Sequence, residues 1–162
     1  MSIVLDKKAI VMEIEVKIKF FEHATKNDIK CPFYATEGST GFDLQAAIDQ
    51  DIVLKPNERV LVPTGIAIAL PEGYEAQVRP RSGLAYKNGV TVLNTPGTVD
   101  SDYRGELKVI LINLSNIDFI LTKGQRIAQV VINQYVKAQF NIVKDLVKTI
   151  RNDKGFGSTG TH

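Results

Sequence analysis

The stretch Glu13-Ile-Glu-Val-Lys-Ile-Lys-Phe20 alternates charged and apolar residues without interruption. Such a period of two predicts a β-strand with one face in water and the other face against a core. Short runs rich in β-branched residues recur downstream, separated by turn signals such as Asn88-Gly89 and Lys123-Gly124. The expected strands cover residues 52–54, 59–62, 65–70, 76–78, 89–93, 106–113, 119–121 and 127–132. Many short strands punctuated by turns indicate an all-β sandwich or barrel.

Only one short helix is expected in this β-rich chain. It would begin after Ser82, whose side-chain oxygen can accept a free backbone N–H as an N-cap, and it would end at Asn88-Gly89. Residues 140–150 fit a helix or a strand by pattern, and both interpretations stay open. Residues 151–162 change character abruptly, because glycine and hydroxyl residues replace the apolar ones, and they are expected to form a mobile tail.

Composition limits the classes of function. The 162 residues favour one domain, and 20 basic against 18 acidic residues give a net charge of +2, which argues against nucleic acid as a partner. Cys31 is the single cysteine and the two histidines are His23 and His162, so a zinc cluster or a histidine-based triad is not expected. Because no apolar run reaches the ~20 residues of a membrane helix, we expect no membrane partner, and the single cysteine favours a reducing, cytoplasmic location.

The segment Arg79-Pro-Arg-Ser-Gly-Leu84 combines two arginines with the expected helix start. Free N–H groups and a partial positive charge at a helix start suit phosphate oxygens, and Arg81 adds a fixed cation. On its own, however, this pattern also fits an ordinary capped helix with two arginines in solvent. It favours an anion site only in combination with other segments.

The segment Asn94-Thr-Pro-Gly-Thr-Val-Asp-Ser-Asp-Tyr-Arg-Gly105 is the densest group of chemically useful side chains. Its Pro-Gly pair predicts a tight turn with positive φ at Gly97, at the tip of a hairpin that joins the preceding strand to the next one. The amide of Asn94 could contact a base edge. If the chain is extended beyond the turn, Asp100 and Asp102 point to the same side, where paired carboxylates could support a magnesium-bound triphosphate or act as a base.

The tail Gly155-Phe-Gly-Ser-Thr-Gly160 places one aromatic ring among glycines and hydroxyls. Phe156 could stack on a base, while the following backbone groups could surround phosphate oxygens. A Gly/Ser-rich end is usually a flexible linker, but linker composition does not explain the phenylalanine.

Taken together, these segments resemble the five ordered motifs of the deoxyuridine triphosphatase (dUTPase) family. The matching stretches are Thr40-Gly-Phe-Asp-Leu-Gln-Ala46, Arg79-Pro-Arg-Ser-Gly-Leu-Ala85, the segment 94–105, Arg126-Ile-Ala-Gln129 and residues 151–160. The resemblance implies a jelly-roll-like β fold in a homotrimer with shared active sites. It also implies hydrolysis of dUTP to dUMP and pyrophosphate with Mg²⁺, which would supply dUMP for thymidylate synthesis and keep uracil out of DNA.

The resemblance also implies a role for each matching residue. Asp100 would activate the water that attacks the α-phosphorus, and Tyr103 would lie under the deoxyribose and exclude a 2′-hydroxyl. Asp43 would contact Mg²⁺ through water, with no protein group bound to the metal directly. The remaining substrate-binding positions would be Asn94, Thr98 and Val99 for uracil, Arg81, Ser82, Gly83 and Gln129 for the phosphates, Lys108 near the substrate, and Arg151, Phe156, Gly157 and Ser158 in a lid.

The resulting domain plan has three parts: an extension over residues 1–12 that is expected to be disordered, a β domain over 13–150, and a mobile lid over 151–162. Two positions depart from the family pattern, since Asn152 and Lys154 replace glycines of the fifth motif. Asparagine adopts positive φ more readily than lysine, so Lys154 is the less expected of the two.

Two other functions are compatible with much of this pattern. One is a dCTP deaminase-like enzyme of the same fold, although the segment 99–103 resembles the hydrolase version. The other is a non-catalytic nucleotide-binding module, which the presence of Asp100 disfavours.

Overall fold

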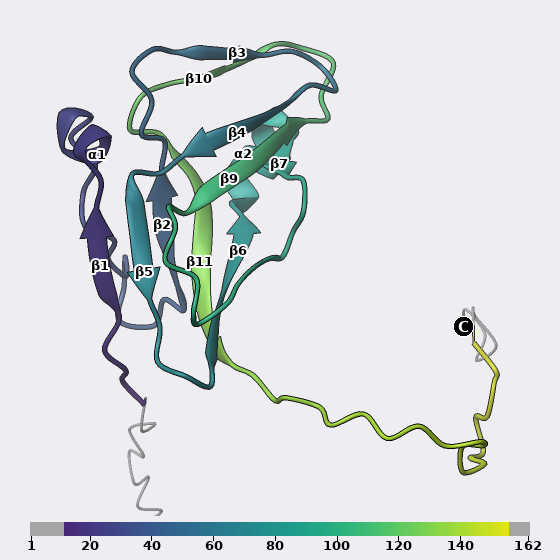
Figure 1. Ribbon diagram of the computed structural model, residues 1–162. Coiled ribbons are helices and arrows are strands. Elements are labelled where there is room, and N and C mark those ends of the chain that lie inside the picture. The colour runs from purple at the N-terminus through teal and green to yellow at the C-terminus, as the bar shows by residue number, and fades with distance from the viewer. Residues whose placement is uncertain (1–11, 156–162) are drawn as a thin grey trace, which may run out of the picture.

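The computed structural model describes residues 12–155, and Figure 1 shows that strands dominate them. The strands are β1 (Lys17–Phe20), β2 (Gly41–Gln45), β3 (Ile52–Leu54), β4 (Arg59–Pro63), β5 (Ile66–Ala69), β6 (Tyr74–Pro80), β7 (Val90–Val92), β8 (Gly97–Val99), β9 (Lys108–Asn113), β10 (Phe119–Leu121) and β11 (Arg126–Gln134). Two short helices, α1 (Glu22–Lys26) and α2 (Ser82–Asn88), complete the set. The prediction of an all-β, jelly-roll-like fold is confirmed.

The strands form two principal antiparallel sheets. One sheet has the order β2-β11-β6-β8 and the other has the order β4-β9-β7, while β1 pairs with β5 and β3 with β10. Alternate side chains of both sheets enter one core, as β9 illustrates, where Val109, Leu111 and Asn113 are buried. The buried amide of Asn113 donates to the carbonyls of Leu54 (2.9 Å) and Ile117 (2.7 Å), which ties the β3–β10 pair to this sheet.

The alternating stretch at residues 13–20 forms a shorter strand than its pattern predicts. Pairing begins only at Lys17, opposite Ala69, because β5 ends there and offers no further partner. Ile18 is nevertheless half-buried between two exposed lysines, so the predicted two-faced character is present.

The helices correct two predictions. A second helix, α1, is present where none was expected, and its Ala24 is fully buried. In α2 the N-cap is Arg81 rather than Ser82, and no side chain caps the free backbone groups, because Ser82 already has helical geometry. The predicted stop is confirmed, since Gly89 adopts φ 65° and a Cβ there would lie 2.8 Å from the Cβ of Ser115.

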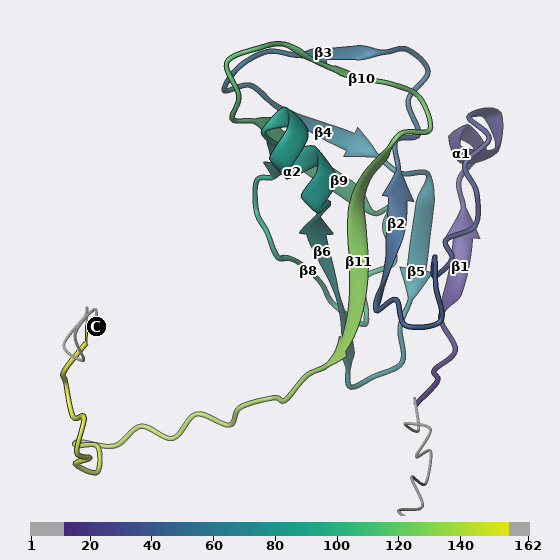
Figure 2. The ribbon, with the colours of Figure 1, turned by 180° about the vertical axis from the view of Figure 1, so that it is seen from behind.

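Residues 136–155 leave the end of β11 and run away from the sheets in both views (Figures 1 and 2). Residues 140–150 form neither of the two elements that their pattern allowed. Several large apolar side chains in this arm are almost fully exposed in the single chain: Val136, Phe140, Ile142, Leu146, Val147 and Ile150. Within residues 12–155, no helix has the length and apolar character needed to cross a membrane.

Candidate active site

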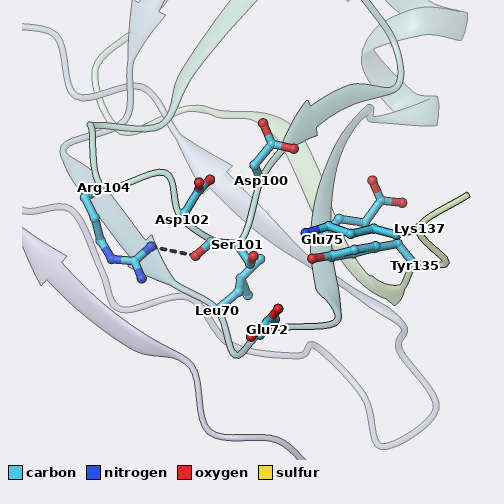
Figure 3. A pocket seen from close by; sticks show the side chains of 9 residues that line it. All are labelled: Leu70, Glu72, Glu75, Asp100, Ser101, Asp102, Arg104, Tyr135 and Lys137. Carbon is cyan, nitrogen blue, oxygen red and sulfur yellow. Dashed lines mark hydrogen bonds between the residues drawn. The ribbon is translucent and has the colours of Figure 1, made fainter. Parts of the chain in front are cut away.

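Asp100 stands at the end of β8, on the rim of a cavity. Strand β8 pairs with β6 so that Val99 lies opposite Ala76, which places Asp100 beside the start of β6. The cavity has a volume of about 530 Å³ and is lined by Leu70, Glu72, Glu75, Asp100, Ser101, Asp102, Arg104, Tyr135 and Lys137. Figure 3 shows the carboxylates of Asp100 and Asp102 projecting from the loop in the same direction.

The loop after Asp100 is a turn rather than an extended segment, because the N–H of Tyr103 donates to the carbonyl of Asp100 (3.2 Å). Arg104 stabilises the turn by donating through Nη1 to the carbonyls of Ser101 (2.6 Å) and Tyr103 (2.8 Å), the first of which is drawn in Figure 3. Asp100 and Asp102 therefore lie on the same side because of this turn, and not because the chain is extended as the sequence predicted.

The segment before Asp100 departs from the predicted hairpin. β7 and β8 belong to different sheets and do not pair with each other, because β8 pairs with β6 and β7 with β9. The Thr95–Pro96 peptide is cis, and Gly97 lies in β8 without positive φ. A Cβ at 97 would lie 3.2 Å from Nδ2 of Asn94, a tight contact that glycine avoids. The structure thus places the side chain of Asn94 close to Gly97, at the start of β8.

A second cluster lies at the far end of the same sheet. Asp43 on β2 accepts from Nε of Arg81 (2.9 Å) with one oxygen and from Nη1 of Arg126 (3.0 Å) with the other. Nε2 of Gln129 donates to the carbonyl of Pro80 (3.0 Å), and Gln129 lies opposite Asp43 in the strand register. Arg81, Gln129 and the start of α2, which contains Ser82 and Gly83, are therefore brought together as expected.

The two clusters occupy opposite ends of β6. Asp100 lies at the level of Glu75, whereas Arg81 follows Pro80. Six residues of strand at ~3.3 Å each separate them by roughly 20 Å. One chain therefore cannot apply Asp100 and Arg81 to the same phosphate group.

The remaining expected positions are divided between the sheet and the tail. Lys108 begins β9, with Nζ 3.8 Å from Oε2 of Glu106. Arg151 lies in a turn on the extended arm, where its Nε donates to the carbonyl of Lys154 (3.0 Å). Asn152 has φ 52°, as asparagine allows, whereas Lys154 avoids positive φ. The expected lid residues Phe156, Gly157 and Ser158 lie outside the described residues.

Sequence reasoning overlooked several polar residues near these clusters. Glu72 and Glu75 come from a loop and from β6, and only the folded chain places them on the cavity of Asp100. Arg126 was read as part of a motif, but its contact with Asp43 was not foreseen. Among residues 12–155, no three acidic, histidine or cysteine side chains gather closely enough to bind a metal by themselves.

Comparison with known proteins identifies the family of the chain. Residues 27–160 match the dUTPase family model. The deoxyuridine 5′-triphosphate nucleotidohydrolase of Hydrogenobaculum sp. (strain Y04AAS1) is 59% identical over 143 residues, covering 88% of this chain and 99% of the relative. The Rickettsia prowazekii protein of the same name is 57% identical over 147 residues, covering 91% and 97%.

The fold comparison points to the same group. The solved structure of the dUTPase of Staphylococcus bacteriophage 80alpha with dUPNHPP superimposes with a TM-score of 0.77 at 26% identity, covering 90% of this chain and 98% of the phage chain. The fold and the positions of the motif residues define a jelly-roll-like nucleotide hydrolase. The chain belongs to the dUTPase family. The prediction of a dUTP diphosphatase is thereby confirmed at the level of the enzyme family.

Proposed function

We propose that this enzyme hydrolyses dUTP to dUMP and pyrophosphate by direct attack of water on the α-phosphorus. Asp100 takes a proton from the water, the water oxygen bonds to the α-phosphorus, and the bond from that phosphorus to the oxygen bridging to the β-phosphate breaks. The pyrophosphate leaves with the electron pair of the broken bond. The observation that supports this function best is the position of Asp100 on the rim of an open cavity, in a segment of the chain that also contains Asn94 and Tyr103.

The neighbours of Asp100 can select the nucleoside. The side chain of Asn94 lies close to Gly97, the first residue of β8, and this amide together with the peptide groups of Thr98 and Val99 would pair with the edge of uracil. Tyr103 is 46% exposed, so its ring is available to a deoxyribose. A ring in contact with the sugar leaves no room for a 2′-hydroxyl, and rejecting a group by shape needs no additional charge.

Mg²⁺ fits as a cofactor that the nucleotide and water hold, because among residues 12–155 no three carboxylates gather closely enough to bind it alone. Mg²⁺ prefers oxygen ligands and keeps several waters and the phosphates of a nucleotide, and the carboxylates of Glu72, Glu75, Asp100 and Asp102 on the cavity could accept from those waters. When bound to the triphosphate, Mg²⁺ would neutralise charge that develops on the phosphate oxygens. For Asp43, both carboxylate oxygens accept from arginines, which supports a role in orienting Arg81; its water-mediated contact with Mg²⁺ stays a prediction.

The separation of the two clusters supports a homotrimer with shared sites. Arg81, with Ser82, Gly83 and Gln129, would bind the phosphates of a nucleotide whose α-phosphorus faces Asp100 of another copy. The exposed apolar side chains of residues 136–150 agree with assembly, because apolar side chains that a single chain leaves exposed are stabilised by burial between chains. Lys108, on the strand that follows the loop of Asp100, would add a cation near the same nucleotide.

Removing residues 151–162 is expected to lower kcat/KM about fiftyfold while the melting temperature stays near that of the intact protein. Arg151, Phe156, Gly157 and Ser158 would close over the nucleotide and exclude water other than the attacking one, whereas residues 151–154, within the described part of this segment, are exposed and outside the core. Pyrophosphate release and thermal unfolding measure the two quantities. Full activity in the truncated protein would contradict a lid.

The reaction itself is tested by pyrophosphate release from dUTP, dTTP, dCTP and UTP in the presence of Mg²⁺. Preference for dUTP by at least about a hundredfold over UTP is expected, because Tyr103 rejects the ribose by shape. Ammonia release from dCTP would instead identify a deaminase-like enzyme, and tight dUTP binding without product would identify a binding module. A cytoplasmic location and a role in dUMP supply follow from this function as proposals.

A further inference from the structure

The loop that contains Tyr103 is attached to the rest of the molecule through the carboxylate of Glu106. Its Oε1 accepts from the backbone N–H of Gly65 (2.8 Å) and lies 2.7 Å from Nε2 of His23. The Glu106 side chain is only 11% exposed, and an ionised carboxylate has no proton to donate. The proton in the contact with His23 is therefore on Nε2, which makes the histidine a donor to a largely buried negative charge.

The backbone of the same glutamate holds the tyrosine. The hydroxyl of Tyr103 donates to the carbonyl of Glu106 (3.1 Å). A Cβ on the intervening Gly105 would collide with the hydroxyl and ring of Tyr103, so the phenol lies directly over that glycine. Next in the chain, Leu107 is fixed by one backbone hydrogen bond to the carbonyl of Ile66 (2.8 Å) and by the hydroxyl of Thr64 (2.6 Å). The backbone of Glu106 thus holds the phenol, while its side chain attaches the same residue to His23 and Gly65.

His23 is itself held in place by the packing of α1. The buried Ala24 of this helix fits against Gly65, which has φ 72° and no room for a side chain. Phe21 donates its N–H to the carbonyl of Gly65 (2.9 Å), and its ring stacks on the imidazole with centroids 5.8 Å apart. The carbonyl of His23 accepts from the side chain of Asn27 (2.8 Å). An imidazole with this much support can fix the rotamer of its partner.

We propose that His23 is a positioning residue that sets the preference for deoxyribose over ribose by holding Glu106 and, through it, Tyr103. This inference rests on the proposed contact between Tyr103 and the deoxyribose. Without the imidazole, the carboxylate keeps the N–H of Gly65 and gains freedom to move toward Nζ of Lys108, which is 3.8 Å from its other oxygen. The imidazole is one of two groups that hold the Glu106 side chain, so its loss would loosen the loop around residue 106, and the phenol would be held less firmly against the sugar.

The test compares kcat/KM for dUTP and UTP in His23→Leu, His23→Gln and Thr25→Leu, all in otherwise intact protein. Leucine removes the donor, glutamine retains an N–H of similar reach, and Thr25→Leu places the same leucine at an exposed position of the same helix. We expect the dUTP-to-UTP ratio to fall about tenfold in His23→Leu, since a hydrogen bond to a charged group is lost. The ratio should stay near the native value in the other two variants.

A native ratio in His23→Leu, even with a lowered melting temperature, would show that the pair only stabilises α1 and would overturn the inference. If His23→Leu does not fold, His23→Asn, whose amide is too short to reach Glu106, is compared with His23→Gln. Equal dUTP-to-UTP ratios in these two variants would also overturn the inference. A native enzyme that does not discriminate between dUTP and UTP would instead contradict the proposed role of Tyr103. Loss of the proposed function and loss of this inference are therefore distinguishable.

Discussion

Asp100→Asn is expected to reduce turnover of dUTP roughly a thousandfold, because asparagine has the shape of aspartate but cannot take a proton from water. The substitution leaves the turn after β8 intact, since the turn depends on the backbone carbonyl of residue 100 and not on its side chain. Affinity for dUTP should therefore change little. Pyrophosphate release measures turnover, and calorimetric titration of the inactive variant with dUTP and Mg²⁺ measures binding.

Asp102→Asn is the matched control for this prediction. Asp102 lines the same cavity two residues further along the same loop, so its substitution changes the charge of the cavity by the same amount. Retention of most activity in Asp102→Asn would separate the loss of a base from the loss of negative charge. Comparable inactivation by both substitutions would show that the carboxylates act as a pair, and Asp100 would no longer be the single base.

Alternating apolar residues and turn-forming residues were sufficient to predict most strands, but not the shortest elements. In β2, Phe42 and Leu44 are buried on alternate positions, yet five residues beginning with glycine give a weak pattern. α1 is also only five residues long, and its stability comes from the fit of Ala24 against Gly65, a contact between segments about forty residues apart in the chain. Contacts of this kind are tertiary and leave no local signal.

The composition of the site could be predicted better than its geometry. Ordered motifs identified Asp43, Arg81 and Asp100, because each matches a distinctive short pattern. The sheet to which β8 belongs was not predictable, since strand pairing is decided by long-range packing and not by the turn that precedes it. The sequence predicts no role for His23, because only the fold brings Glu106, 83 positions away, within hydrogen-bond distance.

Within one chain, Asp100 and Arg81 lie roughly 20 Å apart. We therefore expect that two variants, each inactive by itself, recover activity when their chains assemble together. Asp100→Asn lacks the proposed base but retains the cluster of Arg81 and Gln129, whereas Arg81→Ala retains the proposed base and loses the cation that Asp43 orients. Each variant alone should be nearly inactive. Co-expressed with different tags and purified through both tags, the mixed trimers should have about a third of the native sites, wherever an intact Asp100 meets an intact Arg81.

The control shows whether any recovery is caused by subunit mixing. In this control, the Asp100→Asn and Arg81→Ala proteins are purified separately and combined only after assembly. They should stay inactive if subunits do not exchange. If one chain could apply both ends of β6 to one nucleotide, every chain in the mixed trimers would carry a defect, and activity would stay at the mean of the two variants. Recovery of several hundredfold over that mean is therefore specific to shared sites, because only a second copy can bring an Arg81 within reach of the phosphates next to Asp100.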